Sequence, residues 1–285
     1  MKEIKLLYLY PDMLELYGDY GNIQVIKYGL EKRGFNLIVD KYCIGDEAPD
    51  FTSYDIVFAG GGADNEQSIL SKDLIKYKDN IKEAVEKGVF FLLICGAYQL
   101  FGRYYKGVEG NIIPGLEVFD YYTVAEPDRK KRCIGNIVLS VNLNQFNENN
   151  INLKLEKNEK EKIEFTDENN ANQDNIMDES SIKTKVIGFE NHGGQTFNVE
   201  TPFGKVLYGN GNKFGDIEEG FFKENVIGTY LHGPLLSKNP EISDYIISYC
   251  LNRKYNEEVE IEKLDDSFEE KCRAQLLEKF LGEKE

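Results

Sequence analysis

The first hundred residues alternate between short apolar runs and longer segments in which apolar residues recur every three or four positions. Short apolar runs are typical of strands, and the three-to-four spacing is typical of helices that bury one face. The predicted strands are residues 4–10, 35–43, 55–59 and 89–94, and the predicted helices are residues 23–33 and 70–87. This alternation predicts an α/β fold with a mostly parallel central sheet flanked by helices, and functional loops at the carboxyl ends of the strands.

Beyond residue 105 the pattern changes to short strands and turns, which predicts an antiparallel extension packed on the first half of the chain. The predicted strands here are residues 117–126, 135–143, 186–190, 205–211 and 226–231, and the predicted helices are residues 242–252 and 266–281. We expect a single domain over residues 1–254 and a C-terminal helical tail over residues 255–285.

One segment breaks the pattern. Residues 144–184 are dominated by Asn, Glu, Lys and Asp, with few apolar residues and neither Gly nor Pro. This composition predicts a low-complexity polar insert, either poorly ordered or a solvated excursion between two strands. We expect it to decorate the surface without a catalytic role.

Composition narrows the function classes. The net charge of -16 argues against nonspecific binding to nucleic acid or to an anionic membrane surface. No apolar run reaches the roughly 18 residues that span a bilayer, and the N-terminal residues enter a predicted strand without a signal-peptide cleavage pattern. The five cysteines form no CxxC motif, so we expect no metal site and no disulfide framework. These features predict a cytoplasmic protein without stable membrane insertion.

Cys95 is the first candidate for chemistry. It directly follows the apolar run 89–94, and Gly96 follows it at the start of a segment that can form a helix. A thiol at a sharp strand-to-helix turn is held clear of the sheet, and the amide N–H groups of the following helix favour its thiolate form. The Gly96 amide is then placed to bind a developing oxyanion. The alternative is a core cysteine that happens to precede a helix.

A cysteine nucleophile needs a base, and the chain has two histidines. His232 ends the predicted strand 226–231, just before Gly233 and Pro234 force a turn, and an imidazole there can accept the thiol proton and return it to a leaving amine. His192 lies in a tight Asn-His-Gly-Gly turn that can equally be structural. We therefore expect His232 to be the base, with His192 as the alternative.

The segments FAGGG, ICGAYQ and TYLHGP together resemble the class I glutamine amidotransferase family, in its cobyric-acid-synthase-like branch. The segments YGDYGN, GGGADNEQ, GFENHGGQT and GTYLHGPLLSKNP are similar to the glutaminase subunits of lipid II isoglutaminyl synthases within that family. The resemblance covers nearly the whole chain except the polar insert and about the last thirty residues. ICGAYQ alone is moderately specific, whereas the ordered set of motifs is highly specific.

The resemblance assigns roles to individual residues. It implies that Cys95 is the nucleophile and His232 the base, which agrees with the reading of the residues alone. It also implies that Arg132, three residues before Gly135, binds the carboxylate of the substrate glutamine through a bidentate pair. Arg129 in the same basic cluster is the alternative, and a solvated basic cluster without a site role is another.

The sequence departs from the wider family at one position. Most class I amidotransferases carry Glu two residues after the histidine, and Pro234 stands there in this chain. The site is therefore expected to work as a Cys-His dyad. Asp19, on the loop after the first strand, is a candidate helper, or else the N-cap of the next helix. The oxyanion is expected at the Gly96 amide and an amide of residues 60–62.

The function that the resemblance implies is a glutaminase that hydrolyses L-glutamine through a thioester and supplies ammonia to a Mur-ligase-like synthetase subunit. The two chains would form a heterodimer. The partner would use ATP, and any metal, to amidate the D-glutamate of lipid II to D-isoglutamine for peptidoglycan. This chain itself would need no cofactor.

Three alternatives remain open at this point. One is an amidotransferase subunit for a cobyrinic or cobyric acid acceptor, although the chain has no GxxxxGK[ST] loop of the kind found in P-loop synthetase domains. Another is a DJ-1-like redox or deglycase protein, which places Cys at a similar turn. The last is a non-catalytic scaffold for a ligase.

Overall fold

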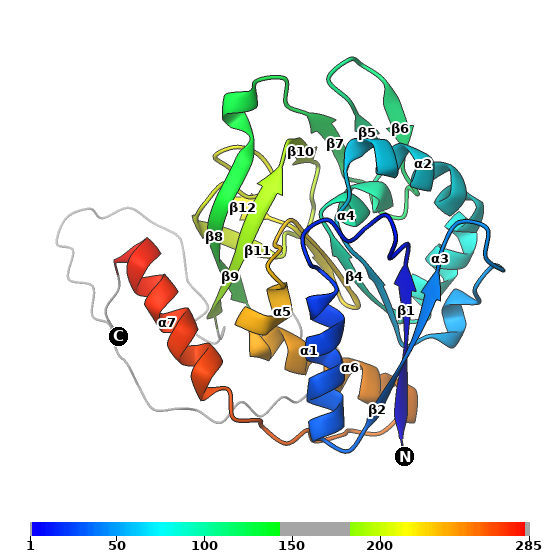
Figure 1. The fold of residues 1–285 in the computed structure, drawn as a ribbon, viewed down its shortest axis with the longest axis vertical. Helices are drawn as coiled ribbons and strands as arrows, with labels where there is room; N and C mark the ends of the chain where they lie inside the picture. The colour runs from blue at the N-terminus through cyan, green and yellow to red at the C-terminus, as the bar shows by residue number, and fades with distance from the viewer. Residues whose placement is uncertain (1, 143–182, 283–285) are drawn as a thin grey trace, which may run out of the picture.

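The computed structural model describes residues 2–142 and 183–282, and its centre is a six-stranded sheet (Figure 1). The strand order is β13-β14-β4-β3-β1-β2, with every neighbouring pair parallel except β13 and β14. The bounds are β1 Glu3–Leu9, β2 Asn36–Tyr42, β3 Ile56–Ala59, β4 Phe90–Ile94, β13 Phe221–Lys223 and β14 Val226–Thr229. The predicted mostly parallel sheet is confirmed, and the loops after β1, β3, β4 and β14 meet at one edge.

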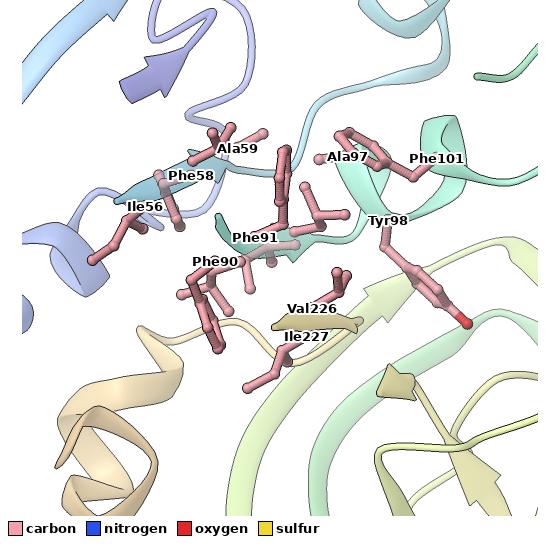
Figure 2. Packing of buried hydrophobic residues seen from close by; sticks show 14 of the residues in the cluster. Ile56, Phe58, Ala59, Phe90, Phe91, Ala97, Tyr98, Phe101, Val226 and Ile227 are labelled. Atoms are coloured by element: carbon pink, nitrogen blue, oxygen red, sulfur yellow. The ribbon is translucent and has the colours of Figure 1, made fainter. Parts of the chain in front are cut away.

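Strand β4 lies at the middle of the core. All five of its residues are fully buried, as the short apolar run predicts for a strand covered on both faces. Phe90 packs against Tyr245 and Tyr249 on one side, while Phe91 packs against Phe101. Figure 2 shows these β4 side chains among those of β3 and β14, with Tyr98 and Phe101 from the helix that follows.

Helices flank the sheet and connect its strands (Figure 1). Helix α1 packs against α5 and α6, and α2 packs against α4. The α-helices are α1 Gly21–Lys32, α2 Asp64–Leu74, α3 Lys78–Glu86, α4 Gly96–Phe101, α5 Leu235–Lys238, α6 Pro240–Tyr255 and α7 Ser267–Leu281. The short 3₁₀ turns are η1 Phe51–Ser53, η2 Ile75–Tyr77 and η3 Arg129–Lys131. None of the described helices is long and apolar enough to cross a membrane.

The single helix predicted for residues 70–87 is wrong. Helix α2 already begins at Asp64, and the turn η2 separates it from α3. Tyr77, in this turn, packs its ring edge-on against Tyr42, and the two hydroxyls lie 2.8 Å apart. The Asp73 carboxylate accepts hydrogen bonds from Tyr10 and Tyr42 just before the turn. Tertiary contacts of these polar groups therefore interrupt the helix, although the spacing of apolar residues in the sequence continues through the break.

The second half of the chain forms two further four-stranded sheets, of order β10-β7-β5-β6 and β12-β11-β8-β9. Both are antiparallel except for the parallel pair β5 and β7, so the predicted extension is largely confirmed. The bounds are β5 Tyr104–Lys106, β6 Ile112–Pro114, β7 Tyr122–Ala125, β8 Cys133–Asn142, β9 Lys183–His192, β10 Gly194–Phe197, β11 Gly204–Tyr208 and β12 Glu218–Glu219.

Of the strand predicted for residues 117–126, only β7, Tyr122–Ala125, forms in the structure. Glu117 has a φ of 49°, which does not fit an extended chain. The N–H groups of Leu116 and Glu117 instead donate to the carbonyls of Leu100 and Gly102. These bonds fold the segment back onto the end of α4 and delay the strand to Tyr122.

The polar insert falls almost wholly outside the described residues. Lys183 and Thr184, which the sequence places in the insert, belong to β9, and Asn142 pairs with Lys183 across the β8–β9 ladder. In the region expected to be a tail, α7 packs Leu277 against Val138 and Ile187 of this ladder. The division into a domain and a tail stays a prediction.

Candidate active site

Cys95 lies at the turn between β4 and α4, in a strained backbone conformation. Its φ is 52° and its ψ is -104°, a region that residues with a side chain rarely adopt. Its N–H donates to the Thr229 carbonyl at 2.7 Å, which ties the turn to the end of β14. The thiol is nearly buried, with 6% of the residue exposed. Strain of this kind, held in place by the surrounding sheet, is typical of a nucleophile elbow.

His232 follows β14 at the same edge of the sheet. Its backbone exchanges two hydrogen bonds with Phe189 of β9, which fixes the residue between the two sheets. The ring is buried, with Nδ1 3.0 Å from both carboxylate oxygens of Asp19. Nδ1 therefore donates to Asp19, and Nε2 has no hydrogen-bond partner in the described part of the chain. Nε2 is thus the ring atom left available for a thiol or a leaving group.

The side chains of Cys95, His232 and Asp19 approach one another closely around Gly61. A Cβ on Gly61 would lie 2.8 Å from His232 Cε1, 3.3 Å from Cys95 Cβ and 3.4 Å from the Asp19 Oδ2 atom. The structure therefore brings Cys95, His232 and Asp19 together around one glycine. Burial lowers the pKa of His232, but the hydrogen bond to Asp19 and the neighbouring Cys95 sulfur outweigh it and raise the pKa to about 10.

The Asp19 carboxylate contacts the candidate site and does not cap the helix that follows it. Helix α1 has Tyr20 as its N-cap residue and no side-chain cap. The Asp19 carboxylate is fully buried and accepts from His232 Nδ1 and, at 3.1 Å, from the Gly61 N–H. Of the two roles open for Asp19 from sequence, the geometry supports the helper over the N-cap.

One amide of the glycine loop after β3, that of Gly62, lies close to Gly96. The Gly61 N–H is bonded to Asp19, and the Gly61 carbonyl accepts from the Leu16 N–H at 3.2 Å. Because the C=O and N–H of a trans peptide point in opposite directions, the Gly62 N–H faces away from Leu16. Gly96 lies close to this N–H, because a Cβ added to Gly96 would come 3.2 Å from the Gly62 nitrogen. The Gly62 and Gly96 amides are therefore neighbours beside Cys95.

A pocket of about 310 Å³ opens in front of the thiol. Cys95 and Gly62 line it, and so does Arg132, which directly precedes β8. The Arg132 Nε and Nη2 atoms donate to Asn191 Oδ1 at 3.2 and 3.0 Å, which holds the guanidinium beside the pocket. Arg129 lies in the exposed turn η3 and does not line the pocket. The geometry thus brings Arg132, and not Arg129, to the site.

His192 also lines the pocket, but its ring is committed elsewhere. Nδ1 lies 2.7 Å from the Gly194 carbonyl, and the ring stacks on Tyr230 with centroids 3.6 Å apart. Complete burial lowers the pKa of His192 to about 3, so the ring is neutral at physiological pH. A neutral, stacked imidazole fits the structural reading of the Asn-His-Gly-Gly turn.

One cluster was not anticipated from the sequence. The side chains of Cys133, Glu190 and His192 place potential metal-ligand atoms within 4.8 Å of one another, all buried. The β8–β9 ladder brings them together, because Cys133 pairs directly with His192. The Glu190 carboxylate already accepts from the amides of Asn210 and Gly211, and burial raises the pKa of the Cys133 thiol to about 12. These partners favour a packing role for the cluster.

Sequence reasoning missed several pocket residues that carry no obvious chemistry in isolation. Tyr17 covers one face of the His232 ring with centroids 4.4 Å apart. Gln67 and Gln99 line the wall beside Cys95 and are hydrogen-bonded to each other. Their signal lay in the motifs GGGADNEQ and ICGAYQ, in which only the glycines and the cysteine were assigned a role.

Comparison with known proteins gives a consistent result. The family described as the CobB/CobQ-like glutamine amidotransferase domain matches residues 5–240. The GatD subunit of lipid II isoglutaminyl synthase (glutamine-hydrolyzing) of Streptococcus pneumoniae is 34% identical over 266 residues, which are 93% of this chain and 86% of that protein. The subunit of the same name from Staphylococcus aureus is 34% identical over 255 residues, 89% of this chain and 87% of its own. A probable cobyric acid synthase of Methanococcus vannielii is 30% identical over 183 residues, 61% of this chain and 29% of its own.

Proposed function

Because this chain belongs to the CobB/CobQ-like glutamine amidotransferase family, we propose that it releases ammonia from glutamine at Cys95 for a separate synthetase subunit. The observation that carries this proposal is the strained elbow at Cys95, beside the His232 ring and the Gly62 and Gly96 amides. These are the parts that acyl transfer to a thiol requires: a nucleophile, an acid–base group and donors for an oxyanion.

The first half of the reaction forms a thioester. His232 accepts the Cys95 proton through Nε2, and the sulfur attacks the side-chain carbonyl carbon of glutamine. The Gly62 and Gly96 amides bind the oxyanion, and one such donor contributes about 3 kcal/mol to the transition state. Collapse of the tetrahedral intermediate breaks the C–N bond, and His232 returns the proton to the leaving ammonia.

The second half restores the enzyme. A water molecule gives a proton to His232 and attacks the thioester carbonyl, and the same two amides bind the second oxyanion. The C–S bond breaks, the proton returns to the sulfur, and glutamate leaves. Asp19 holds His232 in the tautomer that these reaction steps need, in which Nδ1 is protonated and Nε2 is free to accept and donate the proton.

Arg132 anchors the far end of the substrate in this proposal. Its guanidinium lines the pocket that Cys95 closes, and a planar guanidinium suits an α-carboxylate. Glutamine would thus lie with its carboxylate near the surface and its carboxamide at the thiol. No step uses a metal or cofactor on this chain; ATP and any metal would be bound by the synthetase.

For the acceptor, we extend the names of the two GatD relatives to this chain. Both align over most of their own length, which supports the same role in glutamine hydrolysis for amidation of the lipid II D-glutamate to D-isoglutamine. The partner would be a Mur-ligase-like synthetase in a heterodimer, and the reaction would take place in the cytoplasm. A cobyric-acid-type acceptor has weaker support, because that relative aligns over 61% of this chain.

Reconstitution tests this assignment. The full chain would be combined with the neighbouring Mur-ligase-like protein, ATP, L-glutamine and lipid II, and the lipid product analysed by mass spectrometry. We expect the loss of about one mass unit that accompanies conversion of a carboxylate to an amide. Replacing glutamine by ammonium chloride should bypass this chain. Ammonia release without amidation of lipid II would redirect the search to cobyrinic or cobyric acid acceptors, and no release at all would favour the scaffold.

A further inference from the structure

Gln67 holds a polar atom that the described part of the chain does not satisfy. The residue lies in the first turns of α2, only 2% of it is exposed, and it lines the same pocket as Cys95. Its Oε1 atom is buried and has no hydrogen-bond partner among the described residues. A buried acceptor without a donor costs free energy, which a bound donor can recover.

Neighbouring acceptors fix the orientation of the Gln67 amide. Nε2 donates to Gln99 Oε1 at 3.0 Å and approaches the Gly62 carbonyl at 3.4 Å. Gln99 Nε2 in turn donates to the Tyr230 hydroxyl at 3.0 Å, so the three side chains form one chain of hydrogen bonds. A flipped Gln67 would place oxygen against two oxygens, so Oε1 is left facing away from them.

The amide also lies close to the reacting end of the site. A Cβ on Gly96 would come 2.9 Å from Gln67 Nε2, so the Gln67 amide packs directly against Gly96. The Gln67 amide therefore lies next to Gly96, in the wall of the pocket that Cys95 and Arg132 also line.

Glutamine has one polar group that the proposed function leaves without a partner. Its carboxamide is placed at Cys95 and its carboxylate at Arg132, whereas the α-ammonium group, with three N–H donors, needs acceptors. Other acceptors of the pocket wall are engaged: Asn191 Oδ1 by Arg132, and the Gly193 and Gly194 carbonyls by Glu126 N–H and His192. Two buried acceptors of the wall have no hydrogen-bond partner among the described residues, Gln67 Oε1 and His192 Nε2. His192 Nε2 lies 3.9 Å from the buried Glu190 carboxylate, which leaves Gln67 Oε1 as the candidate acceptor.

We infer that Gln67 recognises the α-ammonium group of the substrate glutamine through its Oε1 atom. The inference rests on the proposed function and adds a specificity residue to it. Gln67 would distinguish glutamine from carboxamides that lack the amino group, and Gln99 would act through Gln67 by holding its amide in place.

The test compares two substrates in three forms of the full chain. L-glutamine and 4-carbamoylbutanoate, which is glutamine without its amino group, would be assayed for ammonia release by wild type, Gln67→Met and Glu126→Gln. We expect wild type to prefer glutamine by roughly 10- to 100-fold in kcat/KM, and Gln67→Met to lose most of this preference through a higher KM for glutamine. The kcat/KM for 4-carbamoylbutanoate should stay within about threefold of wild type.

Glu126→Gln is the matched control, because Glu126 is a carboxylate that also lines the pocket. It should keep the wild-type preference. Loss of preference in this variant, and not in Gln67→Met, would mean that Glu126 recognises the α-ammonium group. Equal losses for both substrates in Gln67→Met would mean that Gln67 contacts the carboxamide, and would overturn the inference. Retained hydrolysis of 4-carbamoylbutanoate by Gln67→Met, with a urea unfolding midpoint close to that of wild type, guards against a variant that folds poorly.

Failure of the proposed function would look different. A wild type that releases no ammonia from glutamine contradicts glutamine hydrolysis itself. An active wild type whose preference survives in Gln67→Met contradicts only the role of Gln67.

Discussion

The Asp19 carboxylate lies 3.0 Å from His232 Nδ1, although the two residues are 213 positions apart in the chain. The contact joins the loop after β1 to the end of β14. The same carboxylate accepts from the Gly61 N–H, so one buried acid positions both the proposed base and the oxyanion loop. We propose that Asp19 orients His232, the role that the resemblance assigns to the Glu that most class I amidotransferases carry where this chain has Pro234.

Asp19→Asn should lower kcat strongly while leaving the fold intact. The substitution removes the negative charge that stabilises protonated His232, and it permits the wrong tautomer of the ring. We expect a loss of about 10²- to 10⁴-fold in kcat, with a smaller change in KM. The pH dependence of Cys95 alkylation by iodoacetamide should also change, because the charge state of His232 no longer follows the wild-type profile.

Asp12→Asn is a suitable control for this change. Asp12 lies on the same loop after β1, but its side chain is exposed. Both the turnover and the alkylation profile should match those of wild type. An Asp19→Asn variant that also matched wild type in both measurements would remove Asp19 from the site.

Gly61→Ala should separate activity from stability. The added Cβ would lie 2.8 Å from His232 Cε1, so the ring has to move from its place beside the thiol. Misplacement of this kind costs about 10²-fold in turnover, whereas crowding lowers the free energy of unfolding by about 1–3 kcal/mol. Steady-state kinetics and urea unfolding would measure the two effects. A fully active Gly61→Ala would show that the added methyl group does not displace the His232 ring from its place beside the thiol.

Substitutions at Arg132 and Arg129 test which residue binds the carboxylate. Arg132→Lys keeps the charge but loses the planar pair of donors, so KM for glutamine should rise about 10- to 100-fold with a smaller effect on kcat. Arg129→Ala should change KM by less than about twofold, because that side chain lies outside the pocket. The reverse pattern would assign the carboxylate to Arg129.

His192 should make the protein sensitive to acid. Its folded pKa is about 3, against about 6.5 in an unfolded chain. The unfolded state therefore binds more protons between these values, and stability present above pH 6.5 is lost as the pH falls towards 3, by up to about 1.4 kcal/mol per pH unit. In His192→Gln this component is absent, so urea midpoints at pH 7, 5 and 4 should fall less steeply than in wild type.

His232 should have the opposite effect. Its folded pKa is raised to about 10, so its contribution to stability is complete below pH 6.5 and is lost as the pH rises to 10. His232→Gln should flatten the alkaline side of the stability profile and leave the acid side unchanged. If the two histidine variants altered the same side of the profile, the proposed charge states would be wrong.

Much of the fold could be predicted because its signals are local. The run Val89 to Ile94 is apolar at every position, and the structure buries each of them, as a strand covered on both faces requires. The break between α2 and α3 could not be predicted, since it depends on Tyr77 meeting Tyr42, a residue far away in sequence. The same holds for residues 117–119, whose N–H groups donate to the carbonyls of Phe101 and Gly102 at the end of α4 instead of to a strand.

The candidate site divides in the same way. Cys95 and His232 stand at strand ends followed by glycine, so their types and positions already indicated a shared edge of the sheet. The choice between two roles for Asp19, and between the amides of residues 60–62, depends on distances across the fold. Gln67 gave no signal as a type, because a glutamine on a helix is usually exposed, and only its burial and unpaired oxygen single it out.

The most direct measurement is glutamine hydrolysis by wild type and Cys95→Ala, each with and without the synthetase partner. We expect equal amounts of ammonia and glutamate from wild type, none from Cys95→Ala, and unchanged amidation by the partner when free ammonia is supplied. Ammonia release from glutamine by Cys95→Ala at the wild-type rate would contradict the proposed mechanism.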